Sequence, residues 1–159
     1  MTAVTGRRAG RPTRAEIDLD ALEQNARIVK SCLGAVTQLF AVVKADGYGH
    51  GAVRVAARLS ASGLVAGFAV SLVEEGLELR APSARIDGPI WVMGGAYLGA
   101  HEEMVAHDLV PLVWDLADID ALSRAARRLG KRARVHVKVD TGMSRLGLAP
   151  GAVPAFLQR

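Results

Sequence analysis

The chain has 159 residues, enough for one ordinary hydrophobic core, and half of them are hydrophobic, which excludes an intrinsically disordered protein. The single cysteine, Cys32, excludes a disulfide framework and fits a reducing compartment, so we expect a cytoplasmic protein in which Cys32 is a small core residue on a helix. No apolar run approaches the ~20 residues of a membrane span, and the N-terminal arginines are not followed by the apolar segment of a secretory signal.

The formal net charge is +4, and much of the basic character lies in two clusters. These clusters are Arg7, Arg8, Arg11 and Arg14, then Arg124, Arg127, Arg128, Lys131, Arg132 and Arg134. A basic patch can bind nucleic acid, but neither cluster contains interleaved aromatic residues that could stack on bases. We therefore interpret residues 1–13 as a disordered leader and the second cluster as the solvated face of one helix, and we expect no nucleic-acid partner.

Strand and helix patterns alternate along the chain. Residues 15–19 alternate like a short strand, and Asp20 with Glu23 resembles a capping box at the start of a helix that ends at Gly34. Further strands are predicted at about 38–44, 68–70, 89–93, 110–114 and 133–139, with helices at about 52–62, 71–80, 97–107 and 116–129 between them. This rhythm predicts an α/β fold in which βα units share a parallel sheet.

Lys44 ends the apolar strand at 38–44, directly before a glycine-rich turn through 47–51 that we expect to exclude any regular element. In parallel α/β folds, chemistry is built at this end of the strands. A desolvated lysine amine can form a Schiff base with an aldehyde such as pyridoxal phosphate, and the turn before the next helix offers N–H groups to a phosphate. The alternative is a strand-end lysine that simply extends into water.

The sequence of residues 43–51, Val-Lys-Ala-Asp-Gly-Tyr-Gly-His-Gly, resembles the cofactor-attachment signature of alanine racemases. The resemblance implies that Lys44 carries pyridoxal 5'-phosphate as an internal aldimine and that Tyr48 hydrogen-bonds the cofactor phosphate. His50 either lines the site or has a capping role.

The strand predicted at 133–139 has two different faces. The residues on one face are Val135, Val137 and Val139, and those on the other are Arg134, His136, Lys138 and Asp140. On an exposed antiparallel strand the polar column would face water, whereas in a barrel it would point into the lumen, and the pattern alone does not separate these cases. Arg145 follows just after the strand, where a guanidinium can bind a carboxylate, a phosphate or a phenolate.

Residues 136–147, from His136 to Gly147, also resemble alanine racemases, and a shorter match covers residues 15–25. The resemblance implies that Arg145 reaches the cofactor's ring oxygen and the substrate carboxylate, and that a carbamylated Lys138 holds Arg145 in place. An ammonium beside a guanidinium would be repulsive, and carbamylation would make the pair attractive. The alternative is an unmodified Lys138 paired with Asp140.

Other candidate residues are interpreted as structural. His101 and His107 are six residues apart and lie on different faces of a helix, so we expect no metal site there. Trp91 and Trp114 are predicted to be core aromatic residues.

The resemblance runs from about residue 14 to the last residue. It implies a (β/α)8 TIM-type barrel, a fold of ~250 residues, of which about five of the eight βα units are present. Residues 14–159 would then be the N-terminal part of a pyridoxal-phosphate-binding barrel without its C-terminal β domain, and inactive alone.

The implied activity is racemisation of L- and D-alanine, which supplies D-alanine for peptidoglycan. The second catalytic base would be a tyrosine of the partner subunit, so we expect a homodimer in the full-length enzyme. The alternatives are an amino-acid racemase of broader specificity and a non-catalytic pyridoxal-phosphate carrier of the same barrel type.

Overall fold

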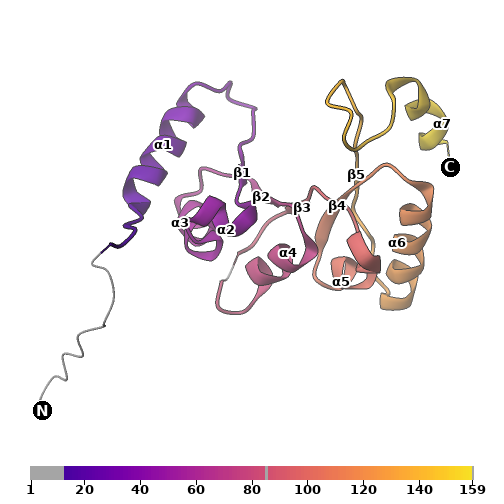
Figure 1. Ribbon diagram of the computed structural model, residues 1–159, viewed down its shortest axis with the longest axis horizontal. Helices are drawn as coiled ribbons and strands as arrows, with labels where there is room; N and C mark the ends of the chain where they lie inside the picture. The colour runs from indigo at the N-terminus through magenta and orange to yellow at the C-terminus, as the bar shows by residue number, and fades with distance from the viewer. Residues whose placement is uncertain (1–12, 85, 159) are drawn as a thin grey trace, which may run out of the picture.

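A computed structural model describes residues 13–84 and 86–158 of the chain (Figure 1). The leader predicted at 1–13 lies outside these ranges except for Thr13, which has no regular structure. No helix within the described ranges combines the length and the apolar character needed to cross a membrane.

The strands in the described ranges form one parallel sheet with the order β1-β2-β3-β4-β5. They are β1 (Phe40–Val42), β2 (Gly67–Val70), β3 (Ile90–Val92), β4 (Leu109–Val113) and β5 (His136–Val137). Sequential order and parallel pairing are typical of successive βα units. The prediction of an α/β fold with about five units of a TIM-type barrel is confirmed.

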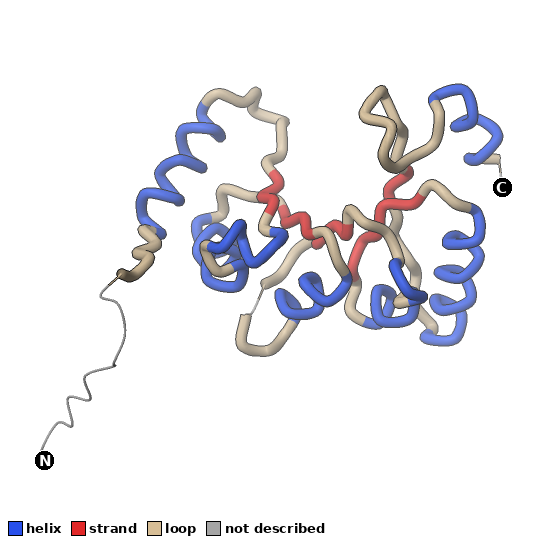
Figure 2. Tube along the Cα trace, viewed as in Figure 1, coloured by secondary structure: helices blue, strands red, loops and turns tan. Residues whose placement is uncertain are grey.

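Helical segments separate and flank these strands. They are α1 (Leu19–Ser31), α2 (Lys44–Gly49), α3 (Ala52–Ser62), α4 (Val73–Arg80), η1 (Tyr97–Gly99), α5 (His101–Ala106), α6 (Leu116–Leu129), η2 (Pro150–Ala152) and α7 (Val153–Leu157). Figure 2 shows α3, α4, α5 and α6 side by side on one face of the sheet, while α1 lies beyond the β1 edge. Arg58 of α3 holds α1 in place because it forms ion pairs with Asp20 and Glu23.

The hydrophobic core lies between the sheet and this row of helices. The strands contribute Phe68, Ile90 and Val92, and the helices contribute Leu79 and Met104, all of which are at most 1% exposed. Burying a side chain of this size contributes about 1.5–3 kcal/mol, so this layer is the main stabilising element of the fold.

The other face of the sheet carries a layer of aromatic rings from alternate strands. The ring of Phe40 in β1 stacks on Trp91 in β3 at 3.9 Å between centroids, and Trp91 contacts the His136 ring in β5 at 4.7 Å. Gly67 lies opposite Phe40 in register and makes room for this layer, because a Cβ there would lie 2.5 Å from Cε1 of Phe40. Layers built from alternate strands are characteristic of a barrel lumen. Trp91 is therefore a partly buried lumenal residue and not a core residue as predicted.

This arrangement decides between the two interpretations of the fifth strand. β5 is parallel to β4, Val137 packs against the helix-side core, and His136 faces the aromatic layer. The polar column of β5 therefore lies on the lumenal face, which is the barrel alternative.

Two predictions near the N-terminus are wrong. Residues 15–18 pair with no strand in the described ranges, and the Asp18 carboxylate instead accepts the N–H groups of Asp20 and Ala21. Asp18 is thus the N-cap of α1, and the alternating pattern was too short to define a strand. Cys32 follows the end of α1 and is exposed, so it is not a core residue.

Two further elements are shorter than predicted. The helix expected at 97–107 is divided into η1 and α5, because Gly99 has φ of 81° and interrupts the helical backbone. The strand expected at 133–139 is reduced to β5, which has a neighbour on one side only within the described sheet. Its ladder continues through the Lys138 N–H, which donates to the Val113 carbonyl at 2.8 Å.

Candidate functional site

Lys44 lies two residues beyond the end of β1, at the start of a turn with left-handed backbone geometry. The four residues that follow it, Ala45–Tyr48, have φ values of 51°, 52°, 62° and 55°. Three of them are not glycine, and the left-handed conformation costs roughly 1–2 kcal/mol for each such residue. The expectation that no regular element forms here is therefore wrong in part, since α2 is one left-handed helical turn. Strain of this kind persists only where neighbouring structure holds it.

Hydrogen bonds from three directions hold this turn. The Ala45 N–H donates to Oε1 of Glu75 at 2.6 Å, and the Gly47 N–H donates to the Val43 carbonyl at 2.8 Å. Oδ1 of Asp46 accepts the N–H of Ala52, the first residue of α3, at 2.7 Å. The turn is thus tied to Val43 after β1, to α3 and to α4.

The histidine of the turn has a structural contact. Nδ1 of His50 lies 2.9 Å from the Gly47 carbonyl oxygen, which accepts a hydrogen bond from it. His50 also lines a cavity of about 440 Å³ with Val42, Gly47 and Tyr48. Of the two roles considered for His50, the contact with Gly47 is the structural one, and Lys44 is not among the residues that line this cavity.

Lys44 and Tyr48 lie close together on this turn. Nζ of Lys44 is 5.9 Å from the centroid of the Tyr48 ring, and the tyrosine is 61% exposed. A Cβ placed at Gly49 or at Gly51 would meet no atom within 4 Å, so there is open space beside the turn. A ligand can approach the backbone there.

The loop after β5 is shaped by Asp140. Its Oδ1 accepts the N–H groups of Ser144 and Gly142, each at 3.0 Å. These two hydrogen bonds are the main reason why the pKa of Asp140 is lowered, and the charge of Lys138 contributes least. The loop closes where the Leu148 N–H donates to the Lys138 carbonyl at 2.9 Å.

The predicted residues of the second motif share one end of the sheet with Lys44. Lys138 is two residues beyond His136 and therefore lies on the lumenal face, and the exposed Arg145 is in the loop after it. Within the described ranges Lys138 and Arg145 make no ion pair with each other or with Asp140. β1 and β5 are the edges of the described sheet, and the aromatic layer spans the space between them.

These side chains are chemically suited to pyridoxal phosphate. They provide a primary amine for an aldehyde, a phenol hydroxyl and open glycine backbone for a phosphate, and a guanidinium for a phenolate or a carboxylate. Lys44, Tyr48 and Arg145 therefore fit the pyridoxal phosphate that the sequence motif implies.

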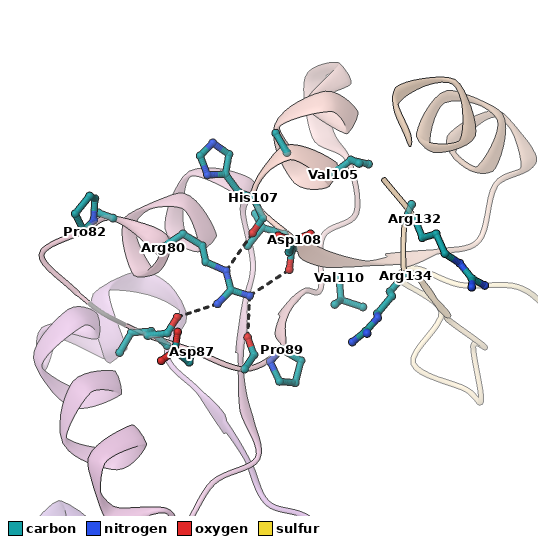
Figure 3. Close-up of a pocket in the computed structure, with 16 residues that line it drawn as sticks. Arg80, Pro82, Asp87, Pro89, Val105, His107, Asp108, Val110, Arg132 and Arg134 are labelled. Carbon is teal, nitrogen blue, oxygen red and sulfur yellow. Dashed lines mark hydrogen bonds between the residues drawn. The ribbon is translucent and has the colours of Figure 1, made fainter. Parts of the chain in front are cut away.

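A larger cavity, of about 1070 Å³, lies at the opposite end of the sheet, where segments enter β3, β4 and β5 (Figure 3). Arg80 donates four hydrogen bonds there to backbone carbonyls. The acceptors are the carbonyl oxygens of Ile86, Gly88, His107 and Asp108. Burial lowers the pKa of Arg80, and the Asp108 and Asp87 carboxylates act against this, so the guanidinium stays charged. This end of the barrel is structural.

Glu75 and Asp46 are the residues of the site that sequence reasoning missed. The sequence predicts a helix over about 71–80, but α4 begins at Val73, and Oε2 of Glu75 accepts the N–H groups of Ser71 and Leu72 at 2.7 and 3.0 Å. A capping box needs a serine or threonine three residues before the glutamate, and Leu72 holds that position for Glu75, so the pattern does not mark Glu75.

His101, rejected as a metal ligand, has its Nε2 2.9 Å from Oδ1 of Asp118 and so joins α5 to α6. In the second basic cluster, Arg128 bonds to Glu102 and Lys131 to Asp108. Both contacts lie on the helix side of the sheet, away from Lys44.

Comparison with known proteins relates this geometry to one family. Residues 17–159 match the family model described as "Alanine racemase, N-terminal domain". The chain is 46% identical over 154 residues to the alanine racemase of Sorangium cellulosum, covering 92% of this chain and 40% of that protein.

Solved structures agree with the sequence relatives. The alanine racemase of Clostridium difficile 630 superposes with a TM-score of 0.85 at 36% identity, over 95% of this chain and 39% of that one. The alanine racemase of Bartonella henselae with covalently bound pyridoxal phosphate has a TM-score of 0.78 at 29% identity, over 90% of this chain and 41% of that one. The chain thus spans about two fifths of the length of these relatives, and it belongs to the family of alanine racemase N-terminal domains.

Proposed function

We propose that the protein is a pyridoxal-phosphate-dependent racemase that interconverts L- and D-alanine. The observation that carries the proposal is the position of Lys44, which lies just beyond the end of β1 and begins a strained left-handed turn with open space beside its glycines. Chemistry in TIM-type barrels is built at this end of the strands. The covalent pyridoxal phosphate of the Bartonella relative supports the same group on this chain.

Each residue of the site has one task in this mechanism. Lys44 would hold the cofactor covalently through Nζ, and Tyr48 would donate its hydroxyl hydrogen to the phosphate. When bound, the cofactor withdraws electrons from the α-carbon of the amino acid and makes its proton acidic. Once the amine of Lys44 is free, it removes or returns that proton on one face. Arg145 orients the carboxylate with two parallel N–H groups, and a carbamylated Lys138 would fix the direction of Arg145.

Racemisation also needs an acid or base on the opposite face of the α-carbon. We assign it to a tyrosine of the partner subunit in a homodimer, as the family resemblance implies. With this arrangement the enzyme would work in the cytoplasm and supply D-alanine for peptidoglycan.

The test uses the full-length protein loaded with pyridoxal phosphate and incubated with L-alanine in D2O. We expect D-alanine that carries deuterium at Cα, and no product from Lys44→Ala. The control is Lys30→Ala, which should keep its activity because Nζ of Lys30 bonds to the Thr37 carbonyl away from the site. Bound cofactor without turnover would favour the carrier alternative. Equal turnover of larger amino acids would favour the racemase of broader specificity.

A further inference from the structure

We propose that Glu75 is a positioning residue for Lys44, which it orients by holding the peptide plane between Lys44 and Ala45. The inference rests on the proposed function, because it concerns the direction of the lysine that would carry the cofactor. Glu75 lies in the first turn of α4, 30 residues from the amide that it binds.

The carboxylate of Glu75 joins two separate segments of the chain. Its Oε2 accepts the N–H groups of Ser71 and Leu72, which precede α4. Its Oε1 accepts the N–H of Ala45 at 2.6 Å, the shortest of the three contacts. The bonds from Ser71 and Leu72 are enough to cap the N-terminus of α4, so the bond from Ala45 acts on the lysine turn instead.

This action on the lysine turn follows from peptide geometry. The Ala45 N–H and the Lys44 carbonyl belong to the same planar peptide unit, so fixing one fixes the other. The orientation of this plane sets ψ of Lys44, and with it the direction in which the lysine side chain leaves the end of β1. Ala45 is also the first left-handed residue of the turn, with φ of 51°, a conformation that an alanine does not keep without support.

The supporting element is itself rigid. α4 packs into the hydrophobic core through Val73 and Leu79, which are 3% and 0% exposed. A carboxylate held on a packed helix can therefore fix the direction of the neighbouring lysine.

The decisive variant is Glu75→Gln, which keeps the size of the side chain but has a single acceptor oxygen. If that oxygen keeps the two amides before α4, the NH2 group faces the Ala45 N–H and the link is lost. Glu74→Gln is the matched control, because Glu74 is the preceding residue on the same helix, is exposed, and forms no hydrogen bond or ion pair within the described ranges. Both variants are compared in the full-length protein.

Three readouts are expected to change in Glu75→Gln and to stay unchanged in Glu74→Gln. The Ala45 amide of the cofactor-free protein exchanges with deuterium about tenfold faster, as expected for loss of a bond to a charged acceptor. The visible circular dichroism of the bound cofactor weakens. The kcat for alanine falls about tenfold while KM stays unchanged, because the substrate carboxylate is bound elsewhere.

The proposal is overturned if Ala45 exchanges equally in both variants, or if it exchanges faster while the dichroism and kcat of Glu75→Gln match those of the control. It is also overturned if Ala45 of the unmodified protein exchanges as fast as an unstructured amide, a measurement that stands even if Glu75→Gln fails to fold. An unmodified protein that carries no cofactor on Lys44 contradicts the proposed function instead, and the exchange rates of the cofactor-free protein still decide whether Glu75 holds the turn.

Discussion

Replacing Arg80 with methionine should destabilise the protein without affecting its chemistry. Methionine keeps most of the apolar stem and removes the guanidinium, so the carbonyls of Ile86, Gly88, His107 and Asp108 lose their donor. The bond to Ile86 is partly buried, and the other three carbonyls can be reached by water. If the bond to Ile86 contributes about 1.5 kcal/mol and each of the other three about 0.5 kcal/mol, Arg80→Met should lower the free energy of unfolding by about 3 kcal/mol.

The assay is urea unfolding of the full-length protein, with kcat for alanine measured on the folded, loaded protein. We expect a lower midpoint for Arg80→Met and an unchanged kcat, because Arg80 lies at the end of the sheet opposite Lys44. Arg80→Lys should recover less than half of the loss, since an ammonium cannot span four carbonyls. A loss below about 0.5 kcal/mol for Arg80→Met would refute the reasoning, because that is the range of ordinary surface substitutions.

The remaining predictions concern the loop after β5 and the aromatic layer. The lowered pKa of Asp140 means that its support of the loop is complete above about pH 4 and is lost as pH falls through its folded-state pKa, so the protection of residues 141–147 against deuterium exchange, relative to the intrinsic rate at each pH, should fall in acid. Asp140→Asn should not show this acid dependence, and a wild-type loop whose protection in acid equals its protection above about pH 4 would contradict the prediction. Lys138→Ala should lose activity and regain part of it with added acetate or chloride; full activity without any anion would contradict the carbamylated bridge. Gly67→Ala should cost about 1–3 kcal/mol in urea unfolding, because the new Cβ would lie 2.5 Å from both Cε1 of Phe40 and the Pro89 carbonyl oxygen, and an unchanged midpoint would show that the layer has room.

Much of the architecture could be predicted from local patterns. The apolar runs around Phe68 and Ile90 predicted strands to within a few residues, because a buried parallel strand needs a continuous apolar sequence. The position of Lys44 just beyond β1 followed from the same pattern in residues 38–44. The lumenal face of β5 could not be assigned until its parallel pairing with β4 was known.

The geometry of the lysine turn could not be predicted, for two physical reasons. Its left-handed residues include Ala45 and Tyr48, which do not favour that conformation, so no local signal marks the whole turn. The bond that supports it joins Ala45 to Glu75, and contacts over such a separation depend on the tertiary fold. The strand predicted at 15–19 failed for a related reason, because the Asp18 carboxylate satisfies the first amides of α1.

The central claim is that Lys44 carries the cofactor. It is tested most directly by reducing the loaded full-length protein with borohydride and mapping the modified peptide by mass spectrometry. We predict a single pyridoxyl group on Lys44. A label on Lys138 or any other lysine, or no label at all, would contradict this account.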